Sequence, residues 1–324
     1  MTSDELRNSI SNILEQPHHT QLYFVLKINN ELILRLADVE DENTTPEIQR
    51  LFEGFLNDAI VFNNDMIIRA LSVADESTNV VYEYDYESYP EELNLFKQFR
   101  IEEAVKTAHF NFNTDNLSHL FGYIVYIGSM ENGIILFKKH YPIFLIKRDT
   151  FLLGMSKSSE RFEKLPGEDI IRLNNDAQLL RVGDTIFVLN LKILERNMGF
   201  KDLIQKAATE TVNAIEELDI VDDIEILRQS LNEPSFARKL SKVKKASPIF
   251  KLDITKESIF EFIKNTPELA DKFKYNEDGT RIHLSSKQSK IEFLKLLNDS
   301  FLRSELTKQY YEASAKDNIT KSIE

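Results

Sequence analysis

Short strand-like runs of apolar residues recur in the first half of this 324-residue chain, whereas apolar residues in much of the second half follow a helical period. Residues 123–127 and 133–138 are alternating or continuous runs of apolar and β-branched side chains, bounded by glycines. Such runs predict strands. From Phe200 to about Asp219, apolar residues return every three or four positions, which predicts a long helix. The chain must therefore form both a sheet and a helical assembly.

The turn residues favour an antiparallel sheet. Asn29-Asn30 joins strands expected over residues 21–28 and 31–37, and asparagine tolerates the positive φ angles of a tight hairpin turn. We predict an α+β fold, in which a mixed, mainly antiparallel sheet forms the N-terminal unit and a largely helical unit follows it. Further strands are expected over residues 143–147, 170–173, 178–182 and 185–189, a hairpin over 273–284, and further helices over 3–15, 90–109, 287–298 and 300–313.

Charge divides the chain unevenly. Residues 1–135 hold 23 acidic and 8 basic side chains, whereas residues 136–324 hold 30 and 32. A polar segment with several serines lies between residues 154 and 168. We therefore expect two domains, an acidic α+β domain over residues 1–155 and a strand-then-helical domain over residues 156–324.

The composition favours a cytoplasmic location. The absence of cysteine excludes disulfides, thiolate metal sites and a cysteine nucleophile, and it suits a reducing compartment. The first six residues lack the basic and apolar regions of a secretory signal. The longest apolar run, residues 134–145, is interrupted by two lysines and a histidine, so no membrane-spanning segment is expected.

Residues 234–252 form a basic island in a chain whose net charge is −13. The island has six basic residues and no acidic one: Arg238, Lys239, Lys242, Lys244, Lys245 and Lys251. Pro234 suits the first turn of a helix, with Asn232 as a possible cap, and residues 247–248 would end that helix. Its apolar face would comprise Phe236, Leu240 and Val243. Its opposite, exposed face would be cationic, with Arg238, Lys242 and Lys245 at the centre.

Three interpretations of the basic island stay open at this stage. It could contact nucleic-acid phosphates, it could dock on an acidic protein surface, or it could be an ordinary solvated helix face whose cations complement the helix dipole. No aromatic side chain interleaves the lysines, which favours phosphate contacts over base stacking. Duplex binding of this kind would have weak sequence preference and strong salt dependence.

No catalytic, metal or cofactor site is expected from the motifs. The glycines are too scattered for a dinucleotide fingerprint, no phosphate-binding loop occurs, and the six histidines lack metal-ligand spacing. The nearest fragment to a metal-dependent nuclease, residues 253–256, ends in Lys256 but lacks a second acid. We therefore expect a protein that is not an enzyme, with a nuclease as the less favoured alternative.

Two blocks of sequence carry a resemblance to a known family. The first block comprises residues 170–173, 185–190 and 197–200, and the second comprises residues 282–284, 293–299, 301–307 and 310–311. Together they resemble the KwaB family of the bacterial Kiwa anti-phage system. The resemblance in pattern extends over about residues 20–315, and no motif in it places a catalytic residue on this chain.

The resemblance implies a cytosolic anti-phage protein that binds DNA and impedes phage DNA replication or late expression. It also implies recruitment to the inner membrane through a membrane-embedded partner, KwaA, and a homo-oligomer, a dimer or a tetramer. The alternative is an interaction scaffold whose basic helix docks a protein. Several basic islands on one oligomer would strengthen binding to one duplex by avidity.

Overall fold

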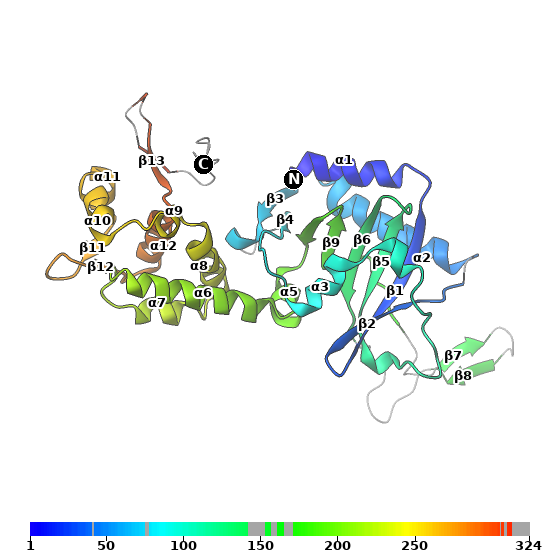
Figure 1. The fold of residues 1–324 in the computed structure, drawn as a ribbon. Coiled ribbons are helices and arrows are strands. Elements are labelled where there is room, and N and C mark those ends of the chain that lie inside the picture. The colour runs from blue at the N-terminus through cyan, green and yellow to red at the C-terminus, as the bar shows by residue number, and fades with distance from the viewer. Residues whose placement is uncertain are drawn as a thin grey trace. The chain divides into compact units, whose positions relative to one another are not determined.

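A computed structural model describes most of the chain, and it confirms the predicted α+β class (Figure 1). The described residues are 1–40, 42–74, 78–141, 153–156, 161–164, 171–304, 306–307 and 310–312. Two compact units are present, the first made of Met1–Leu71 and Glu76–Phe200 and the second of Ser72–Asp75 and Lys201–Glu324.

An eight-stranded sheet forms the first unit, with the order β2-β1-β5-β6-β9-β10-β4-β3. Its strands are β1 (His19–Ile28), β2 (Glu31–Leu36), β3 (Ile67–Ala70), β4 (Val80–Glu83), β5 (Leu120–Gly128), β6 (Gly133–Lys139), β9 (Leu179–Val182) and β10 (Thr185–Val188). Every pairing is antiparallel except β3 with β4. The expected hairpin turn is confirmed, because Asn29 and Asn30 have φ angles of 51° and 69°.

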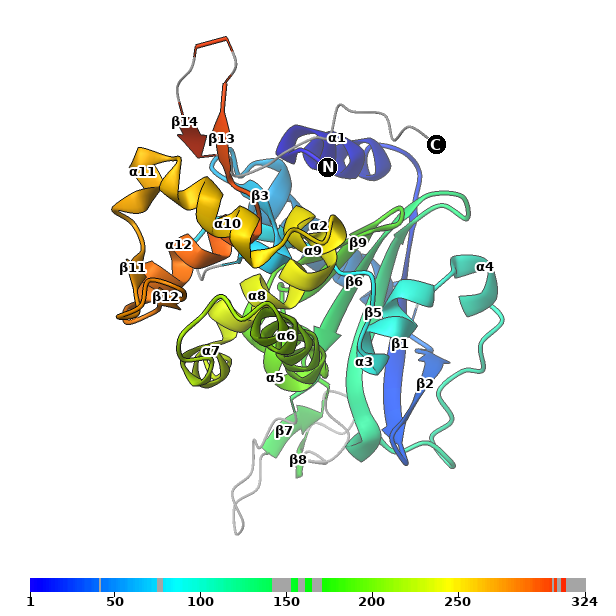
Figure 2. The same ribbon diagram turned by 60° about the vertical axis from the view of Figure 1, so that its left-hand side comes forward.

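Helices cover both faces of this sheet (Figure 2). On one face lie α1 (Ser3–Leu14) and α2 (Thr44–Leu56), whose Phe52 ring lies 6.4 Å from that of Tyr123 in β5. On the other lies α3 (Glu91–Gln98), followed by α4 (Ile101–Ala104). Phe96 of α3 lies 6.2 Å from Phe137 of β6. The remaining elements of this unit are η1 (Asn57–Val61), η3 (Leu117–His119), α5 (Leu191–Asn197) and a separate hairpin of β7 (Leu153–Ser156) and β8 (Arg161–Lys164). The short helix η2 (Leu71–Val73) begins in this unit and continues into residues 72–75 of the second unit.

A buried arginine anchors α3 to the sheet. Arg181 of β9 is 5% exposed, and its guanidinium donates to the carbonyls of Phe96, at 2.9 Å, Lys97, and Phe99, at 2.5 Å. Carbonyls at a helix C-terminus lack partners within the helix, so this cation satisfies them. Burial and, to a smaller extent, the neighbouring Arg100 together lower the pKa of Arg181 to about 10, so the side chain remains charged at neutral pH.

The second unit is largely helical. Its helices are α6 (Phe200–Glu217), α7 (Glu225–Ser230), α8 (Pro234–Ala246), α9 (Pro248–Lys251), α10 (Lys256–Lys264), α11 (Pro267–Ala270) and α12 (Lys287–Leu297). Two small hairpins accompany them, β11 (Lys274–Tyr275) with β12 (Ile282–His283), and β13 (Phe301–Arg303) with β14 (Tyr310–Glu312). The hairpin expected over residues 273–284 is confirmed.

Two local expectations are wrong. Residues 171–173 form no strand, and the helix expected over residues 300–313 is replaced by β13 and β14, in which Leu302 pairs with Tyr311. Asp299 has a φ of 51°, a left-handed conformation that ends α12 and turns the chain into the hairpin. The strand expected at residues 143–147 lies outside the described residues. The domain boundary expected between residues 155 and 156 stays a prediction.

Candidate nucleic-acid interface

The basic island folds mainly as α8 and α9. Pro234 occupies the first turn of α8, where a missing N–H is tolerated. The cap residue is Glu233, and its side chain makes no capping hydrogen bond, so the expected Asn232 cap is wrong. The expected apolar face is confirmed, with Phe236, Leu240 and Val243 all buried.

Arg238 does not belong to an exposed cationic face. Its side chain is 2% exposed, and Nη2 donates to the carbonyl oxygen of Ala74 at 2.6 Å. Ala74 belongs to the short segment of residues 72–75 that groups with the second unit, and it meets the α8 face expected to be open at Arg238. The small residues Ala237 and Ser241, which are also buried, were the signal in the sequence that another segment approaches here.

The five lysines of the basic island differ in exposure. Lys239 and Lys242 are half-buried, whereas Lys244, Lys245 and Lys251 are exposed. Lys244 and Lys245 lie in the last turn of α8, and Lys251 lies in the last turn of α9. The cations therefore sit at two successive helix C-termini, where the helix dipole favours them. We call Lys244, Lys245 and Lys251 the lysine corner.

Ser247 fixes the turn between the two helices of the lysine corner. It is fully buried, its N–H donates to the Val243 carbonyl at 2.8 Å, and its Oγ accepts from the N–H of Ile249 at 3.1 Å. The same hydroxyl donates to the carbonyl of Leu297, at the end of α12. Ser247 thus ends α8 through its main-chain N–H, and its side chain caps α9 and ties the turn to α12, so the lysines project from a rigid corner.

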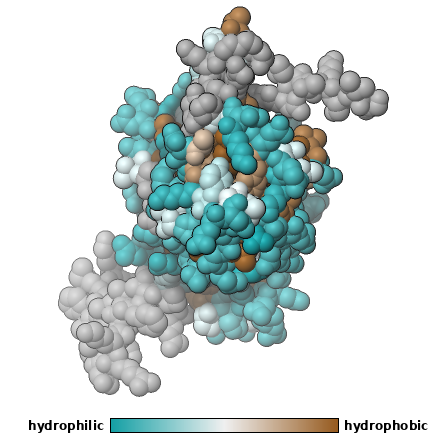
Figure 3. Space-filling model, turned by 90° about the vertical axis from the view of Figure 1, so that its left-hand side faces the viewer, coloured by the Kyte–Doolittle hydropathy of each residue, from teal (hydrophilic) through white to brown (hydrophobic). Residues whose placement is uncertain are grey.

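An apolar pocket of about 230 Å³ lies beside the lysine corner, between α9, α10 and α12. Leu252, directly after Lys251, lines it and is 70% exposed, and Phe262 of α10 is 38% exposed. Figure 3 views the second unit from its α10–α11 side, which is mostly hydrophilic with a few separate apolar patches. Exposed apolar side chains next to cations are a feature that a protein partner could also use.

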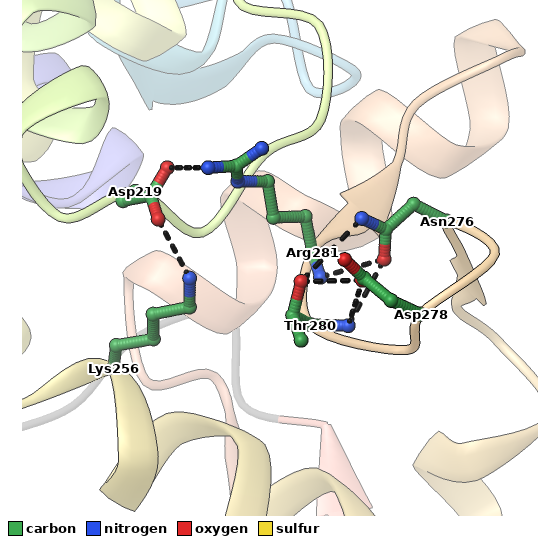
Figure 4. A network of polar contacts seen from close by, with 6 residues as sticks. All are labelled: Asp219, Lys256, Asn276, Asp278, Thr280 and Arg281. Atoms are coloured by element: carbon green, nitrogen blue, oxygen red, sulfur yellow. Dashed lines mark hydrogen bonds and ion pairs between the residues drawn. The ribbon is translucent and has the colours of Figure 1, made fainter.

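The nuclease-like fragment lies in an ion-pair network (Figure 4). Asp219, two residues after the end of α6, accepts from Lys256 Nζ through Oδ2 and from Arg281 through Oδ1, each at 2.8 Å. The Lys256 hydrogen bond lowers the pKa of Asp219, and Arg281 lowers it further. Both carboxylate oxygens are therefore occupied by cations, which gives this network the character of a tether between α6, α10 and the β11–β12 hairpin.

The hairpin turn beside this network satisfies its own polar groups. Asp278 Oδ1 accepts from the N–H of Thr280 at 2.9 Å, and Asn276 Oδ1 accepts from the N–H of Arg281 at 2.9 Å (Figure 4).

Over the described parts of the chain, no three His, Asp or Glu side chains are grouped so that they could hold a metal ion. Within the same residues, no helix combines the length and apolar character that crossing a membrane requires.

Comparison with known proteins gives two matches. The sequence model of a family described as Kiwa protein KwaB-like matches residues 117–307, a span that includes the whole basic island. The Kiwa protein KwaB of Escherichia coli O55:H7 (strain RM12579 / EPEC) is 27% identical over 323 residues, which cover 98% of this chain and 99% of that protein. No solved structure matches the chain.

Proposed function

This chain belongs to the KwaB-like family of Kiwa proteins, and from that premise we propose that it is an anti-phage defence protein that binds duplex DNA at the lysine corner without cutting it. Binding would impede phage DNA replication or late expression. The protein would act as a homo-oligomer in complex with a membrane-embedded partner that recruits it to the inner membrane.

The observation that carries the DNA-binding proposal is the exposure of three lysines on a rigid, acid-free segment. Residues 234–252 contain no Asp or Glu, and Lys244, Lys245 and Lys251 all reach solvent. The hydrogen bonds of Ser247 hold the ends of α8 and α9 in place, so the phosphates of a duplex would meet preorganised charges. Arg238 is not among the residues proposed to contact DNA, because it is buried.

The excess of acid in the first half of the chain would repel DNA phosphates. Residues 1–135 carry 15 more acidic than basic side chains, but the basic island lies outside them. Each lysine corner supplies only three charges, so a single copy would bind DNA weakly at physiological salt. Several copies in one oligomer would bind the same duplex with a large gain from avidity.

A salt titration of duplex binding tests this proposal. Replacing Lys244, Lys245 and Lys251 by alanine should reduce the log–log slope of the binding constant against salt by about 0.9 per lost phosphate contact, or about three in total. The matched control replaces three exposed lysines elsewhere in the second unit, Lys264, Lys274 and Lys287, and should leave the slope almost unchanged. An unchanged slope in the lysine-corner variant would contradict the assignment.

The exposed apolar residues support a second candidate function, an interaction scaffold. Leu252 follows Lys251 directly and is 70% exposed at the mouth of the 230 Å³ pocket. If α8 and α9 dock a protein, the uncharged substitution Leu252→Ser should disrupt the complex with the partner while duplex affinity changes little. If DNA is the ligand, the lysine-corner variant should lose DNA binding while the partner complex persists.

A further inference from the structure

The outer edge of β2 carries main-chain groups that point away from the sheet. Leu36 donates its N–H to the Ala108 carbonyl at 3.1 Å and accepts from the N–H of Phe110 at 2.9 Å, on the side away from β1. Main-chain groups alternate in direction along a strand, so Leu34 and Leu32 point outward as Leu36 does. The main-chain groups of these two leucines are therefore directed to the position that a further strand would occupy.

Among the described residues, pairing along this edge is confined to its end at Leu36. Residues 108–110 run parallel to β2 at Leu36, but the preceding residues come from α4, which ends at Ala104. In the described parts of the chain, no main-chain partner lies beside Leu32 or the N–H of Leu34, and the Leu34 carbonyl accepts only from Arg35 Nη1, at 3.2 Å. The position that a further strand would occupy next to β2 is thus taken by residues 108–110 beside Leu36, and in the described residues no main chain takes it beside Leu32 and Leu34.

A groove of about 500 Å³ runs along this open edge, between β2 and helices α3 and α4. We call it the β2 groove. Its apolar lining includes Leu32 and Leu34 from the strand and Leu95 and Phe99 from the helical side. Phe99 is held by an edge-to-face contact with Tyr23 of β1, at 5.3 Å, so the wall is fixed. Alternate side chains of an added strand would enter this lining.

The charges around the β2 groove are mostly negative. Glu31, Glu91 and Glu103 line it and are exposed, against one exposed cation, Arg100. These residues belong to the half of the chain that carries the acidic excess. A second copy of β2 would bring the same carboxylates together, so the charges favour a basic occupant over self-pairing.

We propose that the β2 groove binds an extended, basic segment of a partner protein by strand addition to β2. The main chain of that segment would pair with Leu32 and Leu34, its alternate apolar side chains would fill the groove, and its flanking lysines or arginines would approach Glu31, Glu91 and Glu103. This site lies in the first unit and does not depend on DNA binding at the lysine corner.

The test uses a fluorescent ten-residue peptide, with alternating valine and threonine in its centre and two lysines at each end. Replacing Glu31, Glu91 and Glu103 by glutamine should weaken its binding by about tenfold, since each exposed charge pair contributes modestly. Leu34→Pro removes the outward N–H and should abolish binding, whereas the matched Leu34→Val keeps that donor and should bind normally. Proline is tolerated where an edge-strand N–H faces outward.

Two further peptides keep the test independent of how the variants fold. A peptide with alternate amides methylated cannot complete the ladder, and one with glutamates in place of the lysines has the wrong charge. Both should bind the unaltered protein at least tenfold more weakly than the first peptide. Equal binding of either, or no saturable binding of the first peptide, would overturn the proposal. Loss of self-association in Leu34→Pro would also overturn it and assign the edge to a second copy.

Discussion

The β2 groove and the lysine corner have opposite charges, and their residues are brought together in different ways. The lysine corner comes from 19 consecutive residues without an acid, so a count along the sequence reveals it. The β2 groove combines residues 31–34 with residues 91–107, which only the fold brings together. A run of like charges can therefore be recognised in a sequence. A groove beside a sheet edge can be recognised only when the strand order and the position of the neighbouring helix are known.

Two buried arginines sharpen this comparison. Arg181 in the first unit and Arg238 in the second each donate to main-chain carbonyls and are almost fully buried. Neither is a surface charge, although Arg238 lies within the basic island. Charge in a sequence thus measures what a segment contains and not what it presents to solvent.

The largest effect is expected from Arg181→Leu. The substitution removes the Arg181 hydrogen bonds from three carbonyls at the end of α3, of which those of Lys97 and Phe99 still accept from Arg100 Nη1. It should lower the free energy of unfolding by about 3 kcal/mol, because the Phe96 carbonyl loses its donor and the buried hydrogen-bond network is broken. The wall of the β2 groove would loosen, so peptide binding should fall as well. Denaturant unfolding followed by circular dichroism measures the change, with the exposed Arg172→Leu as control. A loss no larger than that of the control would contradict the anchoring role.

Arg238→Leu should have the next largest effect. Removing the donor from the Ala74 carbonyl should destabilise the second unit by about 2 kcal/mol. The salt slope of duplex binding should nevertheless stay unchanged at a temperature where the protein is folded, because Arg238 does not reach phosphate. A salt slope reduced by about one unit, with unaltered stability, would instead show that Arg238 contacts a DNA phosphate.

Much of this architecture could be predicted from the sequence. Periodicity and turn residues located β1, β2, β5, β6 and the long helix α6, because these signals depend on residues that are close together in the sequence. The helix expected at residues 300–313 was wrong because its apolar residues fit either period, and the φ of 51° at Asp299 directs the chain into a hairpin. The burial of Arg238 could not be predicted, since residues 72–75 lie far away in the sequence.

Ser247→Ala should have a smaller effect, confined to the lysine corner. The substitution removes the cap of α9 and the hydrogen bond to Leu297, and it should reduce the free energy of unfolding by about 1–2 kcal/mol. Duplex affinity should decline slightly, because the lysines would be held less rigidly, while peptide binding should not change. The exposed Ser258→Ala is the control. Equal unfolding curves for the two variants would contradict the bracing role of Ser247.

The smallest effect is expected from Asp219→Asn, and it depends on pH. Lys256 and then Arg281 lower the pKa of Asp219 below its usual 3.8, so the folded state favours the ionised carboxylate. This stabilisation is complete above pH 3.8 and is lost as pH falls through the lower folded value. The variant should therefore melt slightly below the unaltered protein at neutral pH. The gap should close in acid, and a gap that widens there would contradict the tether.

The central claim is that the lysine corner binds DNA and the β2 groove binds a basic peptide, each without the other. Measuring both affinities for two variants tests it most directly. Replacing Lys244, Lys245 and Lys251 by alanine should weaken duplex binding and leave peptide binding intact. Replacing Glu31, Glu91 and Glu103 by glutamine should weaken peptide binding and not duplex binding. If either variant lost both activities while remaining folded, the two-surface account would be contradicted.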